Sequence, residues 1–217
     1  MRIVVVASGV LAPGDERWLD GADLVFAADG GANALDRLGR RPDRLVGDLD
    51  SADPALVERL EAAGTRIDRH PIDKEASDTE LALRAALAEG AAGVDLLGAT
   101  GGDRLDHELA NLLLLADPAY GDVELRAVVG ATTIRAVRGG REIALRGAPG
   151  DLVTLLPIGG DADGVTTAGL RWPLDGAALP LGGSRGLSNV VVESGASVRL
   201  SDGLLLVVET ASTGEHP

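Results

Sequence analysis

The chain has 217 residues, with 34 acidic and 20 basic side chains and a formal net charge of −14. Its 45% hydrophobic and 25% charged residues are typical of a globular protein and exclude a disordered or collagen-like chain. The absence of cysteine excludes disulfides, zinc–thiolate sites, iron–sulfur clusters and thiol nucleophiles. The negative charge disfavours nucleic acid as a partner, because it repels a phosphate backbone.

No apolar run reaches the roughly 18 residues of a membrane helix. The apolar run after Arg2 breaks off at Ser8 and Gly9, too early for a signal peptide. We therefore expect a cytoplasmic protein without a membrane partner.

The first 130 residues alternate short apolar runs with helical patterns, which is typical of strand–helix–strand units in a parallel sheet. Strands are expected at residues 2–7, 23–28, 45–47, 65–69, 94–97 and 124–129. One helix is expected from about Ala32 and another from Pro54 to Gly64. A third should follow the capping box Ser77-Asp78-Thr79-Glu80. A fourth should end at Asp117-Pro118, with one face formed by Leu105, Leu109, Leu112 and Leu113. The pattern predicts an α/β N-terminal domain with a parallel sheet, residues 1–130.

After about residue 122 the hydrophobic pattern changes from helical to alternating. Short strands are expected at residues 142–145, 152–155, 165–167, 190–192, 198–200 and 204–208, with glycine-rich turns between them. The pattern predicts that residues 131–217 form an all-β sandwich domain. The end from Ser212 is expected to be a frayed tail.

Aspartates follow several of the predicted N-terminal strands. Asp29 follows the second strand, Asp48 and Asp50 follow the third, Asp78 begins the next helix, and Asp106 lies near the start of the last one. Ligands bind beyond the carboxyl ends of strands in an open parallel sheet, and carboxylates gathered there repel one another unless a cation lies among them. Any one of these aspartates alone has an ordinary alternative role as a helix cap or turn residue.

The spacing of Asp48 and Asp50 places both side chains on the same side of an extended chain. Two carboxylates arranged in this way suit a hard cation. Oxygen ligands without cysteine or a histidine pair favour magnesium, which keeps waters and is completed by substrate phosphates.

Glycines and a few cations accompany the aspartates. Gly30 and Gly101 follow predicted strands, where backbone amides can approach phosphate oxygens. Lys74 is the single lysine beside 19 arginines, and Arg104 lies at a predicted helix start between Gly102 and Asp106. Both are candidates for phosphate contacts, although a lone surface lysine or arginine is usually only solvated.

Other familiar motifs are missing or out of place. The chain contains no G-x-G-x-x-G and no Walker A sequence. The string at residues 182–186 matches the nucleophile elbow G-x-S-x-G, but it lies in the β half with no helix behind it. His70 and His107 are interpreted as structural residues or as supports for other site residues.

The first half contains four strings rich in aspartate, glycine or both: Asp29-Gly30-Gly31-Ala32-Asn33, Gly47-Asp48-Leu49-Asp50-Ser51, residues 73–80 (DKEASDTE) and residues 98–107 (GATGGDRLDH). In this order and spacing they resemble the thiamine pyrophosphokinase family. The β half adds residues 169–174 (GLRWPL) and 186–189 (GLSN), which resemble the thiamine-side motifs of that family.

The resemblance implies a magnesium-dependent enzyme that converts ATP and thiamine to AMP and thiamine diphosphate. It implies a catalytic domain at residues 1–130 and a thiamine-binding and dimerisation domain at residues 131–217, with active sites where the subunits of a homodimer meet. By position, the metal ligands are Asp48, Asp50 and Asp78, and these act in catalysis with Arg104. The nucleotide-side residues are Asp29, Gly30, Lys74, Ser77, Asp78, Thr100, Gly101, Arg104 and Asp106, and the thiamine-side residues are Trp172, Ser188 and Asn189.

Three alternatives stay open. A related enzyme of the same architecture would act on another hydroxymethyl heterocycle, such as a pterin alcohol. A thiamine or nucleotide sensor would bind without turnover, but it would not need so many carboxylates. A scaffold protein is disfavoured because the sequence offers no exposed apolar stripe and no charge-block tail.

Overall fold

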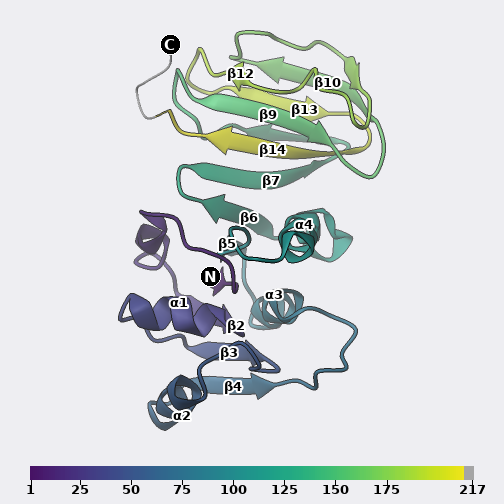
Figure 1. Ribbon diagram of the computed structural model, residues 1–217. Helices are drawn as coiled ribbons and strands as arrows, with labels where there is room; N and C mark the ends of the chain where they lie inside the picture. The colour runs from purple at the N-terminus through teal and green to yellow at the C-terminus, as the bar shows by residue number, and fades with distance from the viewer. Residues whose placement is uncertain (213–217) are drawn as a thin grey trace. The chain divides into compact units, whose positions relative to one another are not determined.

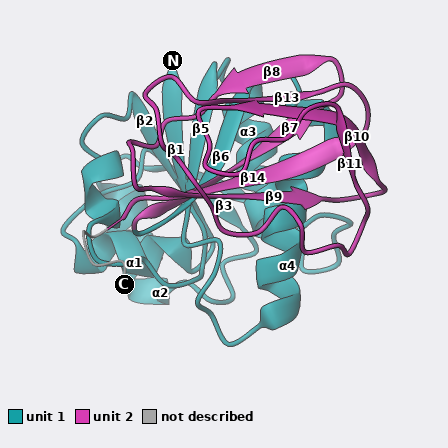
Figure 2. Cartoon of the chain, turned by 90° about the horizontal axis from the view of Figure 1, so that it is seen from above, with its two compact units in different colours: residues 1–130 teal, residues 131–217 magenta. Residues whose placement is uncertain are grey.

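The computed structural model describes residues 1–212 of the chain. The chain divides into two compact units, unit 1 (residues 1–130) and unit 2 (residues 131–217), which Figure 2 shows in teal and magenta. Unit 1 contains helices and strands, whereas the described residues of unit 2 form only strands, turns and loops. This confirms the predicted fold class, an α/β unit followed by an all-β unit.

The described residues of unit 1 form a sheet of six parallel strands (Figure 1). Strand β1 lies at its centre and pairs with both β2 and β5. Residues 3–6, which lie in β1, are all apolar and fully buried, as expected for a strand covered on both faces. In sheet order the strands are β6 (Glu124–Val129), β5 (Gly93–Leu97), β1 (Arg2–Val6), β2 (Leu24–Ala28), β3 (Arg44–Gly47) and β4 (Arg66–Arg69).

Four helices connect the strands of unit 1: α1 (Gly31–Arg37), α2 (Pro54–Ala62), α3 (Asp78–Ala88) and α4 (Leu105–Leu113). The side chains of Asp53 and Ser77 cap α2 and α3, as the sequence predicts. Short 3-10 turns span Asp15–Trp18, Leu114–Ala116 and Pro118–Tyr120. Helices α1 and α2 share one hydrophobic core with Val4 and Val6 of β1, while α3 contacts β1, β2 and β3. The carboxyl end of each strand therefore continues into a loop that can carry site residues.

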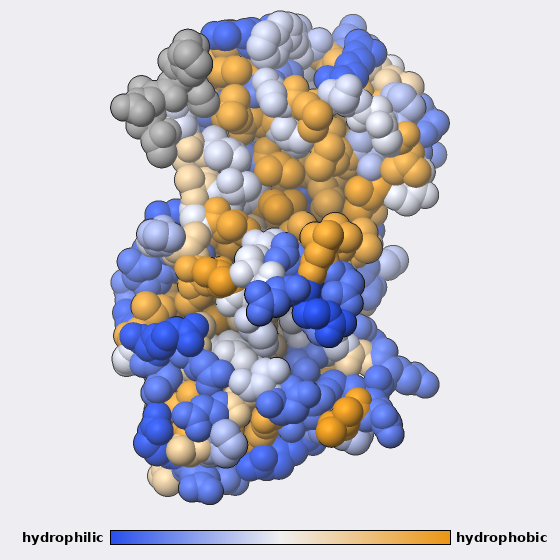
Figure 3. Space-filling model, viewed as in Figure 1, coloured by the Kyte–Doolittle hydropathy of each residue, from blue (hydrophilic) through white to orange (hydrophobic). Residues whose placement is uncertain are grey.

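Helix α4 differs from the expectation. Its leucine face is turned to solvent: Leu105, Leu109 and Leu113 are each more than half exposed, at 67%, 54% and 57%. The buried residue of α4 is instead Asn111, whose amide donates to the carbonyl of Ala99 at 3.0 Å. Figure 3 shows the resulting hydrophobic patch over α4. The expectation that the chain has no exposed apolar stripe is therefore wrong.

Unit 2 consists of two antiparallel sheets that share one core. The first sheet has the order β12 (Asn189–Val190), β9 (Leu152–Pro157), β14 (Leu204–Thr210) and β7 (Thr132–Arg138). The second has the order β11 (Ala177–Leu179), β10 (Ala162–Ala168), β13 (Ser197–Leu200) and β8 (Arg141–Ala144). Buried residues from both sheets, such as Val153, Val165, Val198 and Leu205, form a single cluster. This is the expected sandwich.

Several strands of unit 2 and part of the predicted tail differ from the expectation. β7 and β11 were not predicted, β9 and β14 extend two residues beyond their predicted ends, and β10 begins three residues before its predicted start. Ser212 does not fray, because its backbone N–H donates to Asp151 at 2.8 Å, and the rest of the predicted tail lies outside the described residues. Within residues 1–212, no helix is long and apolar enough to span a membrane.

Candidate active site

A pocket of about 750 Å³ lies at the carboxyl ends of the strands of unit 1. Its lining comes from five segments of the chain, which follow β1, β2, β3, β4 and β5. Eight of the predicted site residues line it: Asp29, Asp48, Asp50, Lys74, Ser77, Asp78, Arg104 and Asp106. Residues separated by up to 77 positions in sequence are thus collected at one edge of the sheet.

Three carboxylates form a tight group in this pocket. Asp29, Asp48 and Asp78 each offer one oxygen, and the three oxygens lie within 4.8 Å of one another. Oδ1 of Asp78 is buried and lies 3.0 Å from the ammonium of Lys74. A set of three convergent carboxylate oxygens fits a hard divalent cation such as magnesium.

The structure corrects the geometry expected for Asp48 and Asp50. The chain between them is not extended, because Leu49 has a φ of 65°, in the left-handed region. As a result the backbone N–H of Asp50 donates to Oδ1 of Asp48 at 3.3 Å, and the Asp50 side chain accepts a hydrogen bond from Ser51 at 3.0 Å. Asp50 lines the pocket, but the third carboxylate of the group is Asp29.

Asp29 is held at its position by burial and by backbone conformation. It is 4% exposed and has a φ of 45°, an unusual value for a residue with a side chain. Burial raises the pKa of the Asp29 carboxyl, and the hydrogen bonds from Ser51 only partly oppose this effect. A buried carboxylate in a strained backbone is typical of a functional position.

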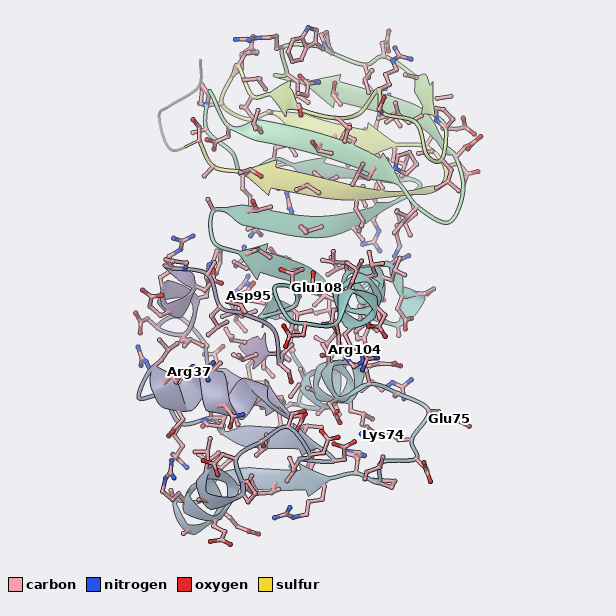
Figure 4. All side chains as sticks on the ribbon, in the orientation of Figure 1. Arg37, Lys74, Glu75, Asp95, Arg104 and Glu108 are labelled. Atoms are coloured by element: carbon pink, nitrogen blue, oxygen red, sulfur yellow. The ribbon has the colours of Figure 1, made fainter. Side chains whose placement is uncertain are left out.

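Lys74 is the basic residue that pairs with carboxylates of this set. It lies on the segment between β4 and α3 (Figure 4), and its ammonium forms ion pairs with Oδ2 of Asp48 and, at 3.0 Å, with Oδ1 of Asp78. The hydrogen bond from Lys74 lowers the pKa of the Asp48 carboxyl below its ordinary value. Burial alone would lower the pKa of Lys74, but its contacts with Asp48 and Asp78 outweigh burial and raise that pKa.

The glycine at the end of β3 makes room for this group. Gly47 has a φ of 150°, and a Cβ atom there would lie 2.9 Å from Oδ1 of Asp78 and 3.1 Å from Cβ of Asp29. Such distances are too short for a real Cβ atom without movement of a neighbour. The close approach of the carboxylates therefore requires glycine at position 47.

The predicted nucleotide-side residues at the starts of α3 and α4 lie on the pocket wall. The Ser77 hydroxyl accepts a hydrogen bond from the N–H of Glu80 at 3.2 Å and so caps α3, an 11-residue helix whose first turn faces the pocket. Arg104 precedes α4 (Figure 4) and forms a two-bond ion pair with Asp106, at 2.9 and 2.6 Å. The Arg104 hydrogen bonds lower the pKa of Asp106 to about 2.

Gly30, Thr100 and Gly101 do not line the pocket directly but support its loops. Gly30 immediately precedes α1, and a Cβ atom there would meet Ser8 at 3.1 Å. The carbonyl of Thr100 accepts a hydrogen bond from Val10 at 2.9 Å. The N–H of Gly101 donates to Glu108 at 2.9 Å, so this amide already has a partner.

Several residues that line the pocket had no predicted role, namely Ser8, Gly9, Glu108 and Asn111. His107, which was interpreted as a structural or supporting residue, lines the pocket as well. Of these, Asn111 carried a detectable signal, since it is a polar residue within a leucine-rich helix.

Asn33 also had no assigned role. Its side chain donates to the carbonyl of Ser51 at 2.8 Å and accepts from the N–H of Asp53 at 3.0 Å. It therefore fixes the loop that follows Asp48 and Asp50.

The three predicted thiamine-side residues lie together in unit 2. Asn189 accepts a hydrogen bond from the N–H of Trp172 at 3.1 Å and donates to the carbonyl of Trp172 at 2.7 Å. The Trp172 ring is 57% exposed, with the Arg171 guanidinium 5.7 Å from its centre. Ser188 has a φ of 57°, and its N–H donates to Thr154 at 3.0 Å. An exposed ring fixed by its backbone is suited to contact an aromatic ligand.

Two family models match the chain, one in each unit. The thiamin pyrophosphokinase catalytic domain matches residues 16–127, and the thiamin pyrophosphokinase vitamin B1 binding domain matches residues 141–205. Two curated relatives are similar over most of their length. The thiamine pyrophosphokinase of Bacillus subtilis is 26% identical, over 96% of this chain and 98% of the relative. Thiamine pyrophosphokinase 3 of Oryza sativa subsp. japonica is 30% identical, over 85% of this chain and 77% of the relative.

Two solved structures agree with these matches. The crystal structure of thiamine pyrophosphokinase from Bacillus subtilis has a TM-score of 0.86 and 25% identity, covering 98% of this chain and 100% of that one. The thiamin pyrophosphokinase structure from Geobacillus thermodenitrificans has a TM-score of 0.82 and 29% identity, covering 99% of both chains. The resemblance found in the sequence is thereby confirmed: the chain belongs to the thiamine pyrophosphokinase family of enzymes.

Proposed function

We propose that the enzyme transfers the pyrophosphate group of ATP to the hydroxyl of thiamine and releases AMP, with magnesium as the metal. The group of Asp29, Asp48 and Asp78 beside Lys74 is the observation that carries this proposal. Oxygen ligands of this kind are typical of sites in which magnesium and substrate phosphates bind together.

In the proposed reaction, the thiamine hydroxyl oxygen forms a bond to the β-phosphorus of ATP. The bond between the β-phosphorus and the oxygen that bridges to the α-phosphorus breaks, and AMP leaves with that oxygen. The hydroxyl proton is lost to solvent or to a carboxylate of the pocket. Catalysis then depends on positioning the reactants in line and on balancing the negative charge of the phosphates.

The residues of unit 1 have separate roles in this proposal. Asp29, Asp48 and Asp78 hold magnesium, and Asp50 lies beside them on the same loop as Asp48. Magnesium, when bound, neutralises charge on the transferring phosphates. Arg104 and the first turn of α3, capped by Ser77, face the polyphosphate with positive charge and backbone N–H groups.

In unit 2, Trp172 supplies a ring face for thiamine, while Ser188 and Asn189 position the backbone around it. Unit 1 is thus the proposed catalytic domain and unit 2 the proposed thiamine-binding and dimerisation domain.

A cytoplasmic homodimer, with active sites where the subunits meet, completes the proposal. The exposed leucines of α4 support a dimer to which unit 1 contributes a surface in addition to unit 2, because a stripe of three leucines, each more than half exposed, is stabilised when a second surface covers it. The same helix supplies Asp106 to the pocket, so a partner bound there would lie close to the site.

Phosphorus NMR of the purified enzyme with thiamine, ATP and magnesium tests the reaction. We expect AMP and thiamine diphosphate to appear together. ADP with thiamine monophosphate would show transfer of a single phosphate and contradict the proposal. Thiamine binding without any product would favour a sensor, and no thiamine binding would favour another heterocyclic alcohol.

A further inference from the structure

The only lysine of the chain, Lys74, lies among the carboxylates of the pocket. The other 19 basic side chains are arginines, and most of those whose ion pairs the structure describes lie nearer the solvent. The Lys74 side chain is 12% exposed and forms ion pairs with Asp48 and Asp78, whose own side chains are 10% and 23% exposed. A mostly buried ammonium thus balances two mostly buried carboxylates.

The oxygens that Lys74 contacts belong to the carboxylates proposed to hold the metal. Asp48 and Asp78, together with Asp29, place their oxygens within 4.8 Å of one another. An ammonium group and a divalent cation at contact distance from the same carboxylates repel each other strongly in a pocket that is partly shielded from water. The two cations therefore compete for Asp48 and Asp78.

Lysine suits such an exchange better than arginine. Its ammonium is compact and lies at the end of a flexible four-carbon stem, whereas a guanidinium is a rigid planar fork. The segment between β4 and α3 that carries Lys74 belongs to neither a helix nor a strand. The head group can therefore leave the carboxylates by rotation of its own stem, without a change in the sheet.

We propose that Lys74 is an internal counter-ion, which holds Asp48 and Asp78 in the metal-free enzyme and is displaced from them when the divalent cation binds. The inference rests on the proposed function, since it takes magnesium as the cation. It assigns Lys74 a second role: the displaced ammonium stays in the pocket, where it can meet the phosphate groups of the substrate. Lys74 then sets the affinity for the metal and couples metal binding to the phosphate side of the pocket.

The side-chain nitrogen of Lys74 can be observed directly in the unmodified enzyme. Because the chain has one lysine, protein made with ¹⁵N-labelled lysine gives a single side-chain ammonium signal. Titration with magnesium alone should shift or broaden this signal with the same midpoint as magnesium binding measured by calorimetry. A signal that stays unchanged while calorimetry shows magnesium binding would overturn the inference.

A pair of matched variants tests the competition. Lys74→Met removes the counter-ion, and Arg59→Met removes an equal charge from an exposed ion pair with Asp36 on the surface of unit 1. Lys74→Met should bind manganese at least about fivefold more tightly than the wild type, in the range usual for coupling between two ligands. Arg59→Met should bind it with unchanged affinity. Binding to Lys74→Met that equals or falls below that of the wild type would overturn the inference.

The two measurements separate the inference from the proposed function. A wild-type enzyme that binds neither magnesium nor manganese would contradict the magnesium site itself. Metal binding that is equal in the wild type and in Lys74→Met would contradict only the role of Lys74. The NMR titration uses the wild-type chain, so it decides the matter even if Lys74→Met does not fold.

Discussion

The carboxylates of unit 1 show how individual residues create the site. Asp29, Asp48 and Asp78 come from three different segments of the chain, and their mutual repulsion is balanced by Lys74. Asp29 and Leu49 have φ values of 45° and 65°, so the chain bends sharply on both sides of the group. Asp29 lines the pocket and Leu49 lies between two residues that line it, and unusual backbone conformations often cluster at functional sites.

Loss of one carboxylate should abolish most of the turnover. We expect Asp48→Ala to lower kcat at least about a hundredfold, because the metal loses a ligand and the phosphates lose its charge. We expect the same loss for Asp50→Ala, because Asp50 lines the pocket on the same loop as Asp48. Steady-state kinetics at saturating magnesium measure the effect, with Glu58→Ala on the exposed surface of α2 as the control. Near-normal turnover of a folded Asp48→Ala enzyme would contradict the assignment.

A second residue-scale prediction concerns the single tyrosine. Tyr120 is 4% exposed, and burial raises the pKa of its hydroxyl from 10 to about 12. Its folded pKa is above the unfolded value, so the corresponding stability is complete below pH 10 and is lost as the pH rises toward 12. The difference corresponds to at most about 3 kcal/mol in the free energy of unfolding.

Ultraviolet titration of this one chromophore measures the shift. The folded protein should ionise near pH 12, and the same protein in denaturant should ionise near pH 10. Equal midpoints in the two states would show that Tyr120 is not shielded from water.

At the scale of elements, the end of β3 controls the spacing of the carboxylates. Gly47→Ala places a Cβ atom 2.9 Å from Asp78, whereas Gly39→Ala adds one in open space at a φ of 65°. Both substitutions should lower the free energy of unfolding by about 1 kcal/mol or more, because both positions have a backbone conformation that favours glycine. Only Gly47→Ala should also weaken manganese binding. Equal manganese affinity in both variants would show that the carboxylates tolerate the added atom.

The elements also show what could be predicted from the sequence. The strands of unit 1 were predicted to within about one residue at each end, since their short apolar runs are bounded by caps, glycines and prolines. β7 was missed because its sequence TTIRAVR mixes threonine and arginine with few apolar residues, and only its pairing with β14 identifies it as a strand. β11 is three residues long, too short to show a period.

The sequence predicted which residues gather in the pocket but not how their side chains are arranged there. Motif spacing and strand ends were enough to select eight residues that line the pocket. The left-handed conformation of Leu49 has no signal in the sequence, so Asp50 was grouped with Asp48 where the structure groups Asp29. The exposure of Leu109 was likewise hidden, because an apolar helix face that meets the core and one that meets solvent have the same period.

At the scale of the whole molecule, the leucine face of α4 predicts the oligomeric state. Leu109→Asp places a charge in the middle of that face and should convert the proposed homodimer to a monomer, because an unpaired carboxylate is costly to bury in an interface. Sedimentation equilibrium measures the mass. Leu38→Asp, at an exposed leucine outside α4, should leave the dimer intact. A Leu109→Asp protein with the same mass as the wild type would place the interface elsewhere.

The central position of β1 constrains how the chain folds while it is being synthesised. β1 is made first, but its second neighbour β5 begins at Gly93. At about 5–20 residues per second, the interval between these strands takes about 5–20 seconds of translation. During that time the nascent chain carries an apolar strand, Ile3 to Val6, with one edge unpaired, which is a template for contact with other chains. The edge of the sheet that carries the carboxylates is thus completed late, and a molecular chaperone that covers β1 would protect it until β5 emerges.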